Sequence, residues 1–384
     1  MRRTRFFVAF GEPENEEAPW RTEERKMTKI RRITTGLLAA VLLLGGGGSS
    51  VEDVYARSKP VVLGYYTGDS QGSLERYRPY MTMLSTDTLN ADENGDLIGF
   101  VPEKTVREAD KFGMETYALV SNYGENGWDG EIAHRVLTNA RAKINLIRQM
   151  RETVRTSGYD GINIDFEEVR PQDREALNRF VRDAAAEMRR FGKKTMVSVP
   201  AKTEDDPENG WSGAFDYAEL GRHADLLQVM TYDEHGIWGE PGSSAGLAWM
   251  DASLKFAVSQ VPSSKLLAGL PAYGNDWNLS DPDDRSGGML KWTDARALAK
   301  KFKTPGVRDP KSLSMVLRYT APGGDKHEVW YEDAYGIKTK TRLVGTYKLA
   351  GISVYAMGME DDSFWKALRS GLSGPAYGPS DRAR

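Results

Sequence analysis

Residues Ile162–Glu167 alternate strictly between apolar and polar side chains. Because strand residues point alternately to opposite faces, Asn163, Asp165 and Glu167 share one face of the predicted strand. The interleaved isoleucines and phenylalanine share the other. Two carboxylates this close push each other's pKa values apart, which is the arrangement that a general acid requires. The segment therefore predicts a proton donor, Glu167, with Asp165 beside it.

Paired carboxylates also occur in buried ion-pair networks and in metal sites. A metal site draws its ligands from several elements, and the chain around this strand supplies no histidine. We therefore interpret the pair as catalytic, and we expect neither a metal nor a cofactor.

Apolar runs rich in β-branched residues predict buried strands after Pro60. The predicted strands are Val61–Tyr66, Met81–Ser85, Met114–Val120, Gly161–Phe166, Thr195–Val199, Leu226–Met230, Leu266–Leu270 and Gly351–Tyr355. Segments with helical periodicity lie between them, such as Thr138–Thr156, Arg174–Phe191 and Trp249–Ser259.

This alternation predicts an α/β fold with a parallel sheet and helical cover, and eight strands fit a closed (β/α)8 TIM barrel. An open, doubly wound sheet is the alternative, but no glycine-rich phosphate loop follows the first strand. In a barrel, Asn163, Asp165 and Glu167 point inward. Glu167 then lies at the carboxyl end, where barrel enzymes keep their chemistry.

Residues 276–345 are too many for one connection between the seventh and eighth strands. They contain a predicted helix, Trp292–Lys303, and a predicted hairpin of Leu313–Tyr319 and Glu328–Tyr331. We interpret the region as a small α+β insertion in a barrel domain that spans residues 60–370. Residues 371–384 are expected to form a frayed tail.

The amino-terminal residues resemble an export signal. Basic residues after Met27, the apolar run Leu37–Leu44 and four glycines follow the order of a secretory signal. The apolar run is short for a membrane span. Residues 27–56 are therefore interpreted as a signal peptide, or as a membrane anchor if uncleaved. Residues 1–26 are either a mispredicted start or a disordered extension.

Composition excludes several classes of function. The net charge is -3 and Lys and Arg form no basic run, so we expect no nucleic-acid partner. The chain has no cysteine, which excludes disulfides, thiolate metal sites and a cysteine nucleophile.

We expect a monomer that is secreted, or associated with the cell wall or spore.

Asp160–Glu167, DGINIDFE, resembles the DGxDxDxE signature of glycoside hydrolase family 18, the chitinase family. Met230–Asp233 (MTYD) and Gly269–Gly274 (GLPAYG) resemble the motifs of the family's sixth and seventh strands. The segments SVPAK, MTYDEHG and VWYEDA are similar to the spore-germination, cortex-lytic N-acetylglucosaminidase branch. That branch often carries LysM repeats, and this sequence contains none.

The resemblance implies substrate-assisted, retaining hydrolysis of β-1,4 bonds at N-acetylglucosamine in peptidoglycan or spore cortex. It implies that Glu167 is the acid and then the base, and that Asp165 holds the acetamido N–H. Tyr232 would bind the acetamido carbonyl, and Asp233 would orient the sugar. A chitinase or a glycan-trimming endo-N-acetylglucosaminidase would share this site. A non-catalytic sugar-binding protein is the alternative of another class, although such relatives usually replace the acid.

Two residues depart from the family pattern. Asn163 replaces the inner aspartate, and we expect its amide to be the hydrogen-bond partner of Asp165. Tyr355 stands where the family usually places a tryptophan beneath the sugar, so less area is offered for stacking. Further residues at or near strand ends are expected to contact the sugar, namely Met230, Tyr65, Tyr273 and Trp277.

Overall fold

The computed structural model describes residues 59–281, 286–378 and 381. The predicted extension 1–26 and the predicted signal or anchor 27–56 lie outside the described residues.

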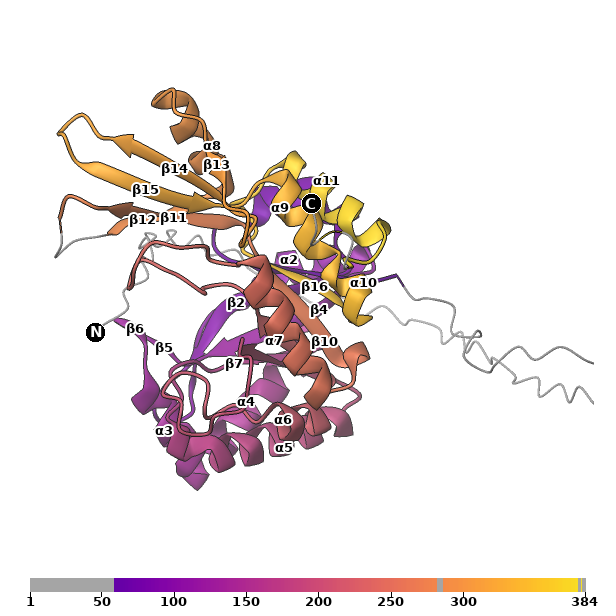
Figure 1. The fold of residues 1–384 in the computed structure, drawn as a ribbon. Helices are drawn as coiled ribbons and strands as arrows, with labels where there is room; N and C mark the ends of the chain where they lie inside the picture. The colour runs from indigo at the N-terminus through magenta and orange to yellow at the C-terminus, as the bar shows by residue number, and fades with distance from the viewer. Residues whose placement is uncertain (1–58, 282–285, 379–380, 382–384) are drawn as a thin grey trace, which may run out of the picture. The chain divides into compact units, whose positions relative to one another are not determined.

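Eight parallel strands close into a barrel within the described chain (Figure 1), in the order β1-β16-β10-β9-β8-β7-β4-β2, with β2 pairing β1 again. The barrel strands are β1 Val61–Tyr66, β2 Met83–Ala91, β4 Glu115–Ser121, β7 Gly161–Asp165, β8 Lys194–Pro200, β9 Leu226–Met230, β10 Leu266–Pro271 and β16 Gly351–Tyr355. The predicted (β/α)8 barrel is confirmed.

The helices of the barrel lie outside this ring of strands (Figure 1). They are α1 Gln71–Tyr77, α2 Glu103–Lys111, α3 Gly130–Thr138, α4 Ala140–Ser157, α5 Arg174–Arg190, α6 Tyr217–His223, α7 Leu247–Gln260, α10 Leu343–Tyr347 and α11 Asp362–Ser373. None of the helices in the described ranges is long and apolar enough to cross a membrane.

The two faces of each barrel strand enter different cores. Ile162 and Ile164 of β7 are fully buried in the large cluster between strands and helices. A second cluster, which includes Leu63 and Met196, fills the barrel interior together with Tyr117 and Leu119. The odd-numbered residues of β7 therefore face inward, as the alternation predicts.

The second strand is longer than its apolar run indicates. Met81 precedes it, because the Met81 N–H donates to the carbonyl oxygen of Arg78 in a preceding turn. β2 continues to Ala91, past a register shift between Asp87 and Leu89, and pairs there with the short antiparallel strand β3, Leu97–Gly99. The extension is polar, so hydropathy alone did not reveal it.

The insertion between β10 and β16 is an antiparallel sheet with helices, as predicted. Its strands are β11 Tyr273–Asn278, β12 Ser286–Lys291, β13 Val307–Arg308, β14 Met315–Thr320 and β15 Lys326–Tyr331, in the order β12-β11-β15-β14-β13. Helix α8 Trp292–Lys301 packs on this sheet, and α9 Ala334–Thr341 follows the sheet in the chain and packs against α11 (Figure 1). A small core of Ala295, Leu317, Val329 and Tyr331 joins α8 to the sheet. A two-stranded hairpin, β5 Tyr123–Gly124 with β6 Gly127–Trp128, follows β4.

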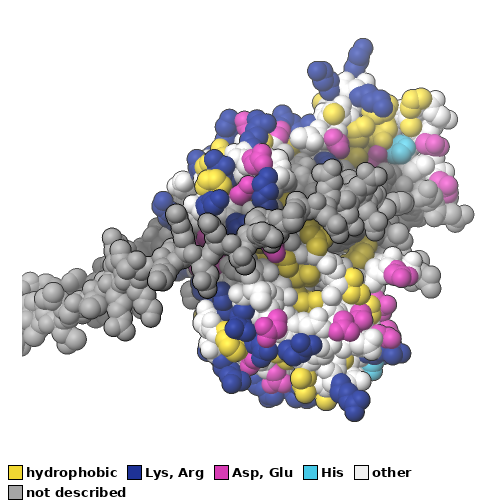
Figure 2. Space-filling view, turned by 180° about the vertical axis from the view of Figure 1, so that it is seen from behind, with side chains coloured by type: hydrophobic (Ala, Val, Ile, Leu, Met, Phe, Trp, Pro, Cys, Tyr) yellow, Lys and Arg dark blue, Asp and Glu magenta, His cyan; other side chains and the backbone are white. Residues whose placement is uncertain are grey.

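The described part of the face seen in Figure 2 carries positive and negative side chains that are interspersed. This mixture agrees with the small net charge of -3.

Gly161 begins β7 at a place without room for a side chain. A Cβ there would lie 2.5 Å from the Lys194 carbonyl oxygen and 2.7 Å from Cε1 of the buried Tyr117 ring. We predict that Gly161→Ala lowers the free energy of unfolding by about 1–3 kcal/mol, as overpacking usually does. Gly72→Ala in α1 meets nothing within 4 Å and is the control. Urea midpoints measure both, and a Gly161→Ala midpoint equal to that of wild type would contradict the prediction.

Candidate active site

Asn163 lies at the centre of a buried polar layer inside the barrel. Its Nδ2 donates to Tyr65 Oη and to Ser85 Oγ, both at 3.3 Å, and its Oδ1 accepts from Ser198 Oγ at 3.2 Å. Asn163, Ser85 and Ser198 are at most 1% exposed. These bonds satisfy the amide with groups from three other strands, as burial requires.

The expected pairing of Asn163 with Asp165 was wrong. Among the described residues, Asn163 bonds to Tyr65, Ser85 and Ser198, and not to Asp165. The reason is depth: Asn163 lies one layer further inside, level with the hydroxyls of neighbouring strands. Asp165 is 8% exposed and lies nearer the mouth.

Glu167 follows β7 at the mouth of the barrel and is 6% exposed. Its backbone is held on both sides by one amide. The Glu167 N–H donates to Asn122 Oδ1 at 2.8 Å, and Asn122 Nδ2 donates to the Glu167 carbonyl at 2.8 Å. The same Nδ2 also donates to the Asp129 carbonyl at 2.9 Å. Asn122 thus fixes the chain after the strand ladder has ended.

Sequence reasoning missed Asn122. It comes directly after β4, the neighbour of β7, so its position at a strand's carboxyl end was the available signal. Its partner is the Glu167 backbone in another loop, and a contact between two loops cannot be predicted from the local sequence around Asn122.

A second pair of hydrogen bonds fixes the chain just after β9. Thr231 Oγ1 donates to the Gly269 carbonyl at 2.7 Å and accepts from the Gly269 N–H at 2.9 Å. The hydroxyl therefore continues the pairing of β9 with β10 by one more step. Tyr232 packs over Gly269, where an added Cβ would lie 2.6 Å from Tyr232 Cε1. Met230, the last residue of β9, is 8% exposed.

Asp233 and Glu168 both adopt left-handed backbone conformations, with φ of 65° and 54°. Such conformations cost of order 1–3 kcal/mol for a residue with a side chain, and they persist where the surroundings hold them. For Asp233 the holding contact comes from Tyr273, whose Oη donates to Asp233 Oδ1 at 2.5 Å. Tyr273 begins the insertion, so the insertion reaches the site directly.

Four tyrosines gather at the mouth of the barrel. The Tyr355 ring lies 5.7 Å from that of Tyr65 and 6.0 Å from that of Tyr232, while Tyr273 packs edge-on to Tyr232 at 6.4 Å. Tyr355 Oη also donates to Asp87 Oδ2 at 3.4 Å.

Burial raises the pKa of Tyr65 and the pKa of Tyr232 far above the usual range. For both phenols the negative charge of Asp165 adds to the effect of burial. Both phenols therefore remain protonated and able to donate at ordinary pH.

The structure does not bring Trp277 together with these residues. Its side chain is fully buried, and its indole N–H donates to the Gly239 carbonyl at 3.0 Å. The ring packs beneath a loop instead of facing an open cleft. No cluster of three or more His, Asp or Glu side chains suited to a metal occurs in residues 59–281, 286–378 or 381.

The arrangement of an acid at the mouth of a (β/α)8 barrel has close parallels. The sequence profile of glycosyl hydrolases family 18 matches residues 89–360. The chain belongs to this family. YvbX of Bacillus subtilis, an uncharacterized glycosylase, is 43% identical over 320 residues, which are 82% of this chain and 92% of YvbX.

Two further relatives of this family 18 hydrolase carry more specific names. A chitinase from Chromobacterium violaceum has a solved structure that matches with a TM-score of 0.78 and 35% identity, covering 82% of this chain and 99% of that chain. A cortical fragment-lytic enzyme of Bacillus subtilis is 29% identical over 299 residues, 76% of this chain and 68% of the relative. The protein is therefore a glycoside hydrolase, and its activity is glycan hydrolysis.

Removing the Asn122 amide should impair catalysis in a protein that still folds. In Asn122→Ala, Glu167 loses both backbone contacts, and displacement of an acid by about 1 Å can cost about 10²-fold in rate. We predict a fall in kcat of about 10–10²-fold on a chromogenic N-acetylglucosamine oligomer. Asn178→Ala, which truncates a buried asparagine in α5, is the control. Wild-type kcat in folded Asn122→Ala would show that Asn122 does not position the acid.

Proposed function

We propose that this family 18 hydrolase is a retaining β-N-acetylglucosaminidase that cleaves β-1,4 bonds in peptidoglycan or spore cortex by substrate-assisted catalysis. The observation that carries the proposal is the placement of Asp165 and Glu167 on one strand face, with Tyr232 nearby. Asp165 ends β7 and Glu167 follows two residues later, so both carboxylates approach the sugar from the same side of the barrel mouth. In ordinary glycosidases the two carboxylates flank the scissile bond. This arrangement favours the substrate's own acetamido group as the nucleophile.

In the first step, Glu167 donates its proton to the glycosidic oxygen as the bond from that oxygen to the anomeric carbon breaks. The acetamido oxygen attacks the anomeric carbon and forms a cyclic oxazolinium ion. Asp165 accepts a hydrogen bond from the acetamido N–H and stabilises the positive charge. The protonated Tyr232 phenol, whose pKa burial raises, donates to the acetamido carbonyl oxygen. Asp233, held by Tyr273, orients the sugar.

In the second step, water attacks the anomeric carbon and the oxazolinium ring opens. Glu167, now ionised, accepts a proton from this water and returns to its starting state. Two displacements at one carbon leave the β configuration unchanged. The tyrosine group that includes Tyr65 and Tyr355 supplies aromatic faces for the sugar, with Asn163 supporting Tyr65 from below. Met230, the last residue of β9, belongs to the proposed substrate-binding set. Trp277, which the sequence also predicts there, is fully buried beneath the Gly239 carbonyl and is not included.

The substrate class rests on relatives. The cortical fragment-lytic enzyme and a putative sporulation-specific glycosylase of Bacillus subtilis, each 29% identical, favour peptidoglycan or cortex. The 35% identity to the Chromobacterium violaceum chitinase supports chitin as the second candidate. The retained acid Glu167 argues against a sugar-binding protein without activity. Digestion of purified cortex, vegetative peptidoglycan and chitin, with product mass and reducing-end analysis, decides among them. Products from chitin alone would overturn the proposed substrate.

We further propose that the enzyme works outside the cytoplasm as a monomer, exported through residues 27–56. The membrane then contacts only this segment, if it stays uncleaved. Export is supported by the order of basic, apolar and glycine residues in the sequence.

Glu167→Gln should abolish turnover while preserving the fold, because the amide keeps the shape of the side chain but cannot donate the acidic proton. Loss of general acid catalysis typically costs about 10²–10⁴-fold. Turnover of a chromogenic oligomer and circular dichroism measure the two effects. A folded variant with half of the wild-type activity would remove Glu167 from its role.

The first product released should be the β anomer, because the acetamido group and then water each invert the anomeric carbon. Proton NMR of the product, recorded before mutarotation, measures this directly. A thiazoline analogue of the oxazolinium ion should also inhibit the enzyme. An α anomer would rule out the mechanism, whatever the substrate.

A further inference from the structure

The connection from β9 to α7 begins in the active site and is closed at its base. We name residues Asp233–Gly246 the Asp233 loop. The Glu234 N–H donates to the Ser244 carbonyl at 3.0 Å, and the Gly246 N–H donates to Glu234 Oε2 at 2.8 Å. Glu234 thus joins the two ends of the loop one residue after Asp233.

The rest of the Asp233 loop is attached to the insertion. Trp277 and Asn275 of β11 donate to Gly239 and to Ser244 Oγ, at 3.0 and 2.9 Å. After the loop, the Leu247 N–H donates to the Ser312 carbonyl at 3.0 Å. The loop therefore receives its shape from the insertion as well as from the barrel.

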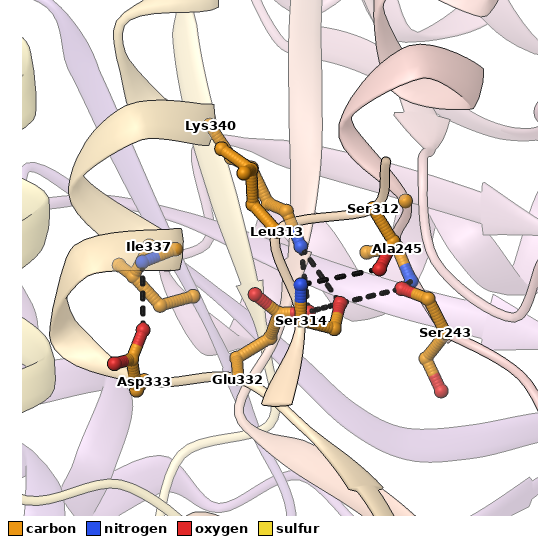
Figure 3. Close-up of polar contacts among 12 residues, drawn as sticks. Ser243, Ala245, Ser312, Leu313, Ser314, Glu332, Asp333, Ile337 and Lys340 are labelled. Carbon is orange, nitrogen blue, oxygen red and sulfur yellow. Dashed lines mark hydrogen bonds and ion pairs between the residues drawn. The ribbon is translucent and has the colours of Figure 1, made fainter. Parts of the chain in front are cut away.

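A fully buried ion pair lies behind this attachment (Figure 3). Lys340 of α9 and Glu332, just after β15, are 1% and 2% exposed, and Lys340 Nζ lies 2.6 Å from Glu332 Oε1. Both contact Ser314 Oγ, at 3.1 Å from Nζ and 2.5 Å from Oε1. Ser314 Oγ in turn lies 2.6 Å from Ser243 Oγ of the loop. We name Ser243, Ser314, Glu332 and Lys340 the Lys340 cluster.

The chemistry of the Lys340 cluster sets the direction of every hydrogen bond in it. An ammonium only donates and a carboxylate only accepts. Ser314 receives a bond from Lys340 and gives its single proton to Glu332. Ser243 must therefore donate to Ser314, which leaves its own oxygen to accept the Ala245 N–H at 3.1 Å. A chain of donors thus runs from the loop backbone to the buried carboxylate.

A buried ion pair is a poor source of stability, because removing both charges from water costs several kcal/mol per ion. Well-packed apolar residues would stabilise the fold as well. What the pair supplies, and apolar residues cannot, is a fixed direction for the two serine hydroxyls. The contacts that depend on this direction belong to the loop that carries Asp233.

We propose that the Lys340 cluster positions the Asp233 loop, and through it Asp233 and Tyr232, for the reaction. Lys340, Glu332 and Ser314 lie between β10 and β16, and Ser243 lies in the loop itself. All four are positioning residues that do not touch the sugar. The effect on turnover rests on the proposed function, whereas the effect on the loop does not.

Ser243→Ala tests the proposal most directly, because it removes the hydroxyl on the loop side and leaves the ion pair in place. We expect faster hydrogen exchange of the Glu234, Ala245, Gly246 and Leu247 amides, with unchanged exchange in β7. We also expect kcat/KM to fall about tenfold, the size of one lost hydrogen bond. Thr341→Val is the matched control, because its Oγ1 donates to the Ile337 carbonyl within α9.

A double-mutant cycle separates positioning from general damage. If the cluster acts through Asp233, then Ser243→Ala should cost little further activity in an Asp233→Asn background. Full additivity of the two losses would overturn the proposal. Unchanged exchange of the Glu234, Ala245, Gly246 and Leu247 amides in Ser243→Ala would also overturn it.

The ion pair itself is tested with both charges replaced. Lys340→Met alone would bury an unpaired carboxylate and would be expected to unfold the protein. The double variant Lys340→Met/Glu332→Leu avoids this and should reproduce the loop exchange of Ser243→Ala. Wild-type exchange in the folded double variant would show that the pair does not orient the serines. The exchange experiments hold even if no glycan is turned over, so the two proposals fail separately.

Discussion

The structure depends on one geometric constraint. In a closed ring of parallel strands, side chains must alternate between the inside and the outside of the barrel. Once β16 pairs with β1, every second residue of each strand faces the interior of the barrel. Apolar side chains such as Leu63 and Met196 pack together inside the barrel, further from the mouth. Polar side chains are admitted only where neighbouring strands supply partners, as Ser85 and Ser198 do for Asn163. Asp165 and then Glu167 follow on the same face, beyond that layer.

Beyond the ends of the strands, side-chain hydrogen bonds hold the chain in place of the backbone hydrogen bonds of the sheet. Asn122 holds both polar groups of the Glu167 backbone, and the Thr231 hydroxyl bridges β9 to Gly269. Tyr273 holds the strained Asp233 in the same way. Each of these contacts joins a residue just beyond a strand to a different element, which is another loop for Asn122, β10 for Thr231 and β11 for Asp233. The precision of the site therefore comes from contacts between elements. The barrel supplies the frame to which those connections are attached.

Most of the barrel strands could be predicted from the sequence, but few of the side-chain contacts beyond the strand ends could. The strand runs were predicted almost to the residue, because a buried parallel strand must be apolar. The polar end of β2 was not, because it carries no such run. Glu167 and Asp165 could be placed from alternation alone. The partners of Asn163, the role of Asn122 and the burial of Trp277 depend on which residues lie opposite across strands or loops. That register is a property of the whole fold, and local patterns do not encode it.

The order of the chain has a consequence for how this enzyme comes into being. β7 and its acid are made midway through synthesis, but β16, which closes the ring against β1, is among the last elements. The insertion that shapes the Asp233 loop is also made late. A nascent chain thus contains Asp165 and Glu167 long before the barrel that positions them has closed. Pairings between segments that are far apart in the chain form slowly. Hydrolytic activity should therefore appear only after β16 and the insertion have packed against the earlier strands. Closure of the barrel around the candidate site therefore requires a strand that is synthesised near the end of the chain.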